Sequence, residues 1–140
     1  MINDKLKEIE NLISNFERID IKRLNELFST ALKSLTNHID NYIGDYPTFI
    51  EPVYLEENVK IGDDVLLGPN VYIGKNCNIG DYVEISNSIL FDNVKISENL
   101  TLENCIIANG CVMNFSNINF NKFVLKGVSE SETELEKLAF

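Results

Sequence analysis

Few residues of this sequence have the type and spacing that catalysis requires. His38 is the only histidine, so it is the one side chain whose ordinary chemistry suits a general base at neutral pH. No carboxylate or nucleophile lies at a spacing that would orient its ring, and His38 borders the apolar stripe of an expected helix. We interpret His38 as a partly solvated helix residue and expect no catalytic residue in the chain.

The cysteines and the acidic pairs also favour structural interpretations. Cys77 and Cys111 take equivalent small, inward positions in the repeat described below, two coils apart. Two coils would separate their Cα atoms by about 10 Å, whereas a disulfide needs about 7 Å or less, so we expect core thiols. Glu56-Glu57 and Asp63-Asp64 fall at expected corners with no third ligand fixed by spacing, so we expect solvated charges, no metal and no cofactor.

The composition is that of a folded, acidic protein. Its 140 residues, 44% of them hydrophobic, allow one domain with appendages and leave no room for a large catalytic domain. The net charge of −10 opposes binding to nucleic acid or to an anionic membrane. Three cysteines and the absence of a secretory or membrane-spanning run predict a cytoplasmic protein with reduced thiols.

Residues 1–45 carry a helical period and predict a helical hairpin for oligomerisation or docking. Apolar residues recur at steps of three and four, first from Ile2 to Phe16 and then from Leu24 to Ile43. Asp20 can cap the second helix, and Gly44 can end it. A hairpin of this size cannot bury its own apolar stripe, so the stripe must pack on the rest of the chain or on a partner.

After Pro47 the apolar period changes to six. Asparagine, aspartate and glycine recur between the apolar positions, where a tight corner would require positive φ. Three short sides of six residues close one triangular coil, and from Phe91 a step of five shortens the later coils to 17 residues. The pattern predicts about four coils over residues 46–121, followed by an extension over 122–140 with a short capping helix. The apolar positions with a spacing of six are Leu55, Ile61, Leu67, Ile73, Ile79, Ile85 and Phe91.

The repeat, aliphatic-Gly-x-Asn/Asp-small-x over residues 51–114, resembles the hexapeptide-repeat left-handed β-helix family. Residues 51–62 and 87–96 are most similar to the C-terminal domain of sugar-1-phosphate nucleotidyltransferases, the nucleotide-sugar pyrophosphorylases, whose catalytic domain we expect to be absent. The resemblance implies a mainly β fold, a single-stranded left-handed parallel β-helix, and transferase relatives. The handedness comes from the resemblance alone, because crossovers are otherwise right-handed.

Two functions stay open at this point. Residues 51–120 hold ten acidic residues and three lysines, a surface that repels the phosphates of nucleotides and coenzyme A. This charge favours a non-catalytic assembly or regulatory module, with a separate catalytic chain as a candidate partner. The alternative is a small hexapeptide-type acyltransferase or nucleotidyltransferase with a site between subunits, which family association alone supports. Relatives of this fold imply a homo-oligomer, a trimer somewhat ahead of a dimer.

One outward column predicts an interface. The residue before each main apolar position should point outward, and one of the three faces then carries Tyr54, Tyr72, Leu90 and Ile107. A column of large apolar side chains on an open sheet face is uncommon in a soluble monomer. We expect the N-terminal helices or another subunit to cover it.

Overall fold

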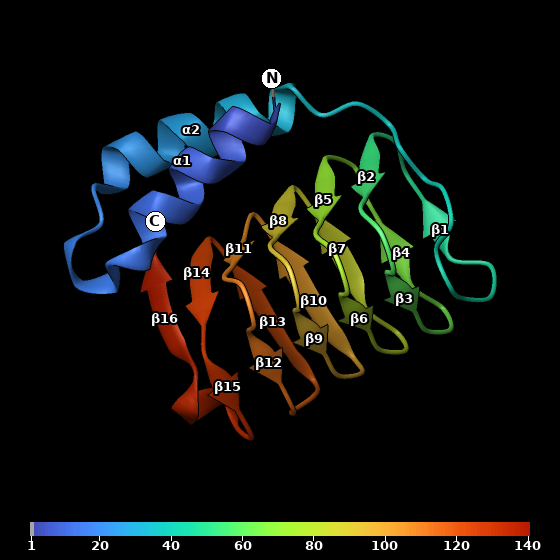
Figure 1. Ribbon diagram of the computed structural model, residues 1–140. Helices are drawn as coiled ribbons and strands as arrows, with labels where there is room; N and C mark the ends of the chain where they lie inside the picture. Colours follow the sequence, from blue (N-terminus) through green and yellow to red (C-terminus); the bar gives the residue numbers. More distant parts are fainter. Residues whose placement is uncertain (1) are drawn as a thin grey trace.

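The computed structural model describes residues 2–140, which form a helical hairpin followed by a parallel β-solenoid of about five turns (Figure 1). Helix α1 spans Ile2–Ser14 and helix α2 spans Ile21–Lys33, joined by the 3-10 turn η1 at Phe16–Arg18. The carboxylate of Asp20 accepts the Arg23 N–H and so caps α2 as the sequence predicts. Neither helix is long and apolar enough to cross a bilayer.

Three parallel sheets form the sides of the solenoid. The first, which we call sheet A, consists of β2 (Val53–Leu55), β5 (Val71–Ile73), β8 (Ser88–Leu90), β11 (Ile106–Ile107) and β14 (Phe123–Lys126). Sheet B consists of β3 (Lys60–Ile61), β6 (Asn78–Ile79), β9 (Lys95–Ile96), β12 (Val112–Met113) and β15 (Val128–Ser129). Sheet C consists of β1 (Thr48–Phe49), β4 (Leu66–Leu67), β7 (Glu84–Ser86), β10 (Leu100–Glu103) and β13 (Ile118–Asn121).

The corners follow the chemistry that the sequence predicts. Asn58, Asn76 and Asn93 stack in one corner column with φ of 60°, 61° and 62°, and Gly110 continues the column with φ of 75°. The Asn58 amide donates to Oδ1 of Asn76 over 2.9 Å, so neighbouring coils are joined through their corner side chains. Asparagine tolerates this left-handed conformation better than most residues, which explains its repetition.

The solenoid begins earlier than the sequence predicts. The expected second helix was to reach Ile43, but α2 ends at Lys33, and His38 and Ile43 form parallel bridges to Tyr54 and Lys60. Residues 38–50 therefore make an additional turn, which we call the first coil. Leu35, Ile39 and Ile43 keep a helical spacing, but threonine and asparagine at positions 36, 37 and 41 are weak helix formers, and Asn41 has a φ of 54°.

The C-terminal end of sheet A is covered by a strand and not by the predicted helix. A single 3-10 turn, η2 (Glu132–Glu134), leads into β16 (Glu136–Ala139), which pairs antiparallel with β14 at the end of sheet A. Leu135 enters the solenoid core and is 5% exposed. A short isolated helix is marginal in water, whereas β16 satisfies the backbone groups at the edge of β14.

Candidate functional site

The outer face of sheet A is covered by the chain's own helices. Its outward column runs through Tyr54, Tyr72, Ile89, Ile106 and Val124, as the strand registers show. These side chains join one apolar cluster with α1 and α2, which lie along the solenoid (Figure 1). The helix residues in that cluster are Leu6, Ile9, Ile13, Leu24, Leu27, Phe28 and Ala31. An apolar face that would draw a second subunit is thus already buried.

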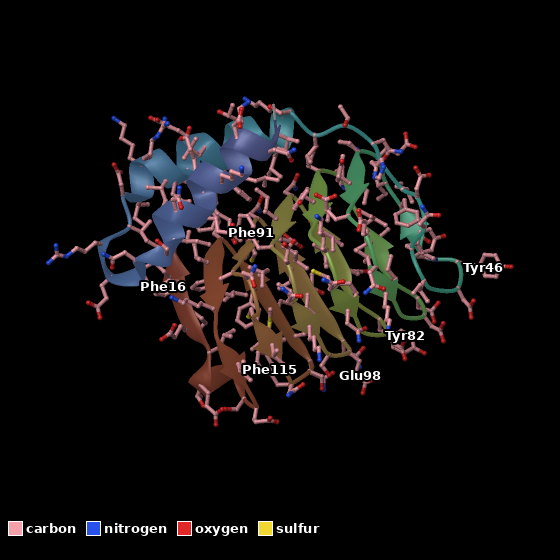
Figure 2. The ribbon with its side chains drawn as sticks, viewed as in Figure 1. Phe16, Tyr46, Tyr82, Phe91, Glu98 and Phe115 are labelled. Atoms are coloured by element: carbon pink, nitrogen blue, oxygen red, sulfur yellow. The ribbon has the colours of Figure 1, made fainter. Side chains whose placement is uncertain are left out.

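The structure corrects two members of the predicted column. Tyr54 and Tyr72 point outward, but Leu90 and Ile107 point into the solenoid, where both are fully buried. The sequence prediction placed the first step of five residues after Phe91. In the structure Ile73 aligns with Leu90, so the shortened step comes one corner earlier, at Asn87. Phe91 consequently belongs to the helix-facing cluster (Figure 2).

The outward column starts at His38, in a stack of aromatic rings. The imidazole lies 4.7 Å from the Tyr54 ring at 22°, and Tyr54 lies 5.7 Å from the Tyr72 ring at 23°. His38 Nδ1 is 3.0 Å from the carbonyl oxygen of Leu55, which can only accept, so Nδ1 carries the proton. His38 is therefore a solenoid residue held by its stack, and not the helix residue predicted.

Carboxylates surround this stack at the end of the solenoid. His38, Asp40 and Asn41 from the first coil and residues 54–57 from the next coil line a cavity of about 310 Å³. Glu56 Oε2 accepts the Tyr72 hydroxyl over 2.8 Å, and Asp40 Oδ2 lies 3.7 Å from His38 Nε2. Burial and the neighbouring Glu56 carboxylate raise the pKa of Tyr72 far above its ordinary value, so that phenol stays a hydrogen-bond donor. The cavity is acidic on its open side.

The first coil leaves its outer backbone edge open. Thr48 and Ile50 donate their N–H groups to the carbonyls of Val65 and Leu67 in the next coil. Because backbone groups alternate along a strand, the N–H and C=O of Phe49 face away from the solenoid. The same alternation applies at Ile39, since both backbone groups of His38 bond to the next coil.

Exposed apolar side chains accompany this open edge. Ile43 is 55% exposed, Tyr46 is 95% exposed and Ile50 is 46% exposed. Tyr46 and the exposed Tyr82 extend from corners near this end of the molecule (Figure 2). We did not predict these residues from the sequence. The sequence does contain a sign that the repeat begins this early. Residues 43–46 read Ile-Gly-Asp-Tyr, as do residues 79–82, at an offset of two coils of 18 residues.

Comparison with protein families identifies the solenoid. The family described as GMPPB C-terminal domain matches residues 49–128, which are 80 of the 140 residues. The chain belongs to this family. A comparison with curated proteins gave no match. Among solved structures, the hexapeptide-repeat containing acetyltransferase VCA0836 from Vibrio cholerae shares 13% identity over 98% of this chain and 90% of that chain, with a TM-score of 0.30.

The features particular to this chain flank its GMPPB C-terminal domain match. The match begins at Phe49 and ends at Val128, so the helical hairpin, most of the first coil and the strand β16 lie outside it. The parallel β-solenoid agrees with the hexapeptide-repeat family that the sequence resembles. The matched segment supplies the scaffold, and the flanking segments determine which of its surfaces are covered.

All three cysteines of this GMPPB C-terminal domain protein are free and buried. Burial raises the pKa of Cys77 and Cys105 to about 11 and that of Cys111 to about 12. Thiols held in the neutral form are poor nucleophiles. Among residues 2–140, no group of three or more His, Cys, Asp or Glu side chains is placed to hold a metal ion.

A larger cavity of about 540 Å³ lies at the opposite end, between η1 and β16. Glu17 and Glu136 line it together with Lys126 and Lys137, so its charges offset one another. Lys137 also pairs with Glu132 over 3.0 Å. This cavity lacks the concentration of one charge that distinguishes the end beside His38.

Proposed function

We propose that this chain is a non-catalytic assembly or regulatory module that docks on another protein through the first coil. The observation that carries the proposal is a difference in cover: α1 and α2 bury the face of sheet A and β16 covers its C-terminal edge, whereas the first coil keeps an open edge with exposed Ile43, Tyr46 and Ile50. Open solenoid edges invite strand pairing. A separate catalytic chain of the pyrophosphorylase type is the partner that the family suggests.

A homo-oligomer remains part of the proposal, with a trimer ahead of a dimer, but it cannot use the outer face of sheet A. The sequence left open whether the N-terminal helices or another subunit covers that face, and the helices occupy it. Self-association would have to use another surface of the chain. Size-exclusion chromatography with light scattering measures the oligomeric state directly.

Thermal unfolding in the presence of candidate substrates tests the non-catalytic role. The purified chain is titrated with acetyl-CoA, UTP, dTTP and sugar phosphates, with bovine serum albumin as a control for non-specific shifts. We expect no stabilisation, because ten acidic residues and three lysines between residues 51 and 120 disfavour phosphate groups. A ligand at a hundred times its dissociation constant adds about 2.7 kcal/mol of stability, and such a shift would favour the acyltransferase or nucleotidyltransferase alternative.

A further inference from the structure

We infer that the open edge of the first coil binds a basic segment of the partner protein, which adds to the coil as a further turn with a short strand on each side. The inference rests on the proposed docking function and assigns the chemistry of the partner. Three features support it: the unpaired backbone, the apolar side chains beside it, and a concentration of negative charge at this end of the chain.

The backbone provides the first argument. The N–H and C=O groups of Ile39 and Phe49 face away from the solenoid, as derived above from the bonds of their neighbours. At the other end, the chain fills the equivalent place on the sheet A side with β16, which pairs with β14 over four residue pairs. A segment from a partner can occupy the open edge in the same way, with main-chain hydrogen bonds supplying affinity.

The side chains provide the second argument. Ile43 is exposed on the sheet B side and Ile50 on the sheet C side, with Tyr46 between them along the chain, so the added turn would have apolar surface to cover. A purely polar segment would leave this surface in water. The bound segment should therefore alternate apolar residues with charged residues.

The negative charge at this end of the chain indicates a basic partner. Residues 36–65 contain seven acidic residues, Asp40, Asp45, Glu51, Glu56, Glu57, Asp63 and Asp64, against the single lysine Lys60. The opposite end, residues 118–140, has four acidic residues and three lysines. A second copy docking edge to edge would bring its own acidic residues into repulsion with these. Lysine and arginine on the partner would be attracted instead.

The cavity beside His38 gives one of those basic side chains a place to bind. It is bounded by Asp40 and Glu57, which are exposed, and by Glu56, whose carboxylate is fixed by the Tyr72 hydroxyl. The stacked rings of His38 and Tyr54 form a rigid wall. A planar guanidinium bound between carboxylates makes charge-assisted, bidentate hydrogen bonds, so we assign this cavity to an arginine of the added turn.

The test uses a capped peptide of alternating arginine and valine, titrated into the full chain and followed by calorimetry and amide NMR. We expect saturable binding, shifts concentrated in residues 37–57, and slower hydrogen exchange at Ile39 and Phe49. A peptide of alternating glutamate and valine should not bind. The arginine peptide with every second amide nitrogen methylated keeps its charge but loses the donors that face the edge, and it should also fail.

Two double variants distinguish binding of an arginine in the cavity from a general effect of negative charge on peptide affinity. D40N/E56Q should weaken the peptide about tenfold, because it removes two carboxylate partners of the arginine. The matched variant E84Q/E98Q removes two exposed carboxylates elsewhere and should change affinity by less than about twofold. Unchanged thermal midpoints of both variants show that neither loss reflects unfolding.

Several results would overturn the inference. They are absence of peptide binding, equal binding of the methylated peptide, equal losses in the two double variants, or a dimer in light scattering that the peptide dissociates, which would assign the edge to a second copy. None of these results touches the non-catalytic role. Stabilisation by a nucleotide or acetyl-CoA would count against that role, whatever the peptide does.

Discussion

The two ends of this solenoid differ in how far their core and their backbone edges are covered. At the C-terminal end, Leu135 fills the core and β16 pairs with the last strand of sheet A. At the N-terminal end, Ile39, Tyr42 and Phe49 only partly bury their side chains, and the backbone edge stays unpaired on its outer side. Because every coil exposes such an edge until something covers it, an end left open is a surface available to another protein.

Replacing Leu135 by alanine should give the largest change in this comparison. The substitution opens a cavity under the C-terminal cap and should lower the free energy of unfolding by about 3 kcal/mol. Ile50→Ala, at the open end, is the control and should cost less than about 0.5 kcal/mol, since Ile50 is already 46% exposed. Urea unfolding measures both, and equal losses would refute the difference between the ends.

Gly68→Ala should loosen the first coil specifically. Gly68 has a φ of 111°, and a Cβ there would collide with the carbonyl oxygen of Ile50. We expect a loss of about 2 kcal/mol, together with faster hydrogen exchange at Thr48 and Ile50. Gly110→Ala, where a Cβ meets nothing within 4 Å, should cost about 1 kcal/mol for its φ of 75° alone. Uniformly faster exchange in all coils would contradict the local effect.

Raising the pH should destabilise the coils through their buried thiols. Burial raises the pKa of Cys77 to about 11 from an ordinary value of 9.0, so the folded state keeps a proton that the unfolded state releases. Stability is therefore unaffected below pH 9 and falls as the pH rises toward 11, by about 1.4 kcal/mol for this thiol at pH 10. Comparing Cys77→Ala with the parent chain at pH 7 and pH 10 isolates the contribution. A pH-independent difference would refute it.

Asn76→Ala should give the smallest effect, near the middle of the corner column. It places alanine at a φ of 61° and removes the bond from Asn58, at a cost of about 1 kcal/mol. Asn76→Gly relieves the backbone conformation and should recover part of that loss. If glycine is no better than alanine in thermal unfolding, the conformational explanation of the asparagine column is wrong.

The sequence predicts the regular coils well because their determinants are local. Positive φ at Asn58, Asn76 and Asn93 requires particular residue types, and these recur at a fixed spacing. The slip at Leu90 was not predicted correctly, because Ile89 and Leu90 are both apolar and both buried, on opposite sides of sheet A. Periodicity cannot distinguish inward from outward residues in a strand that is covered on both faces.

The ends could not be predicted in the same way, because their structure depends on distant contacts. His38 follows a helical spacing in the sequence, and only its pairing with Tyr54 in the next coil places it in the solenoid. Leu135 and Leu138 also have a helical spacing, yet one enters the core and the other pairs with Val124. The acidic cavity beside His38 joins residues from two coils, which no local pattern reveals.

The helical hairpin also has about the length of the parallel part of sheet A. Helix α1 has 13 residues, a length of about 20 Å, and the five parallel strands of sheet A have four spacings that add to about 19 Å. A solenoid can otherwise gain or lose a turn without disturbing its neighbours. Here an inserted coil would carry an apolar residue past the end of the helices and into water. Duplication or loss of a repeat would therefore change the apolar area that the hairpin buries.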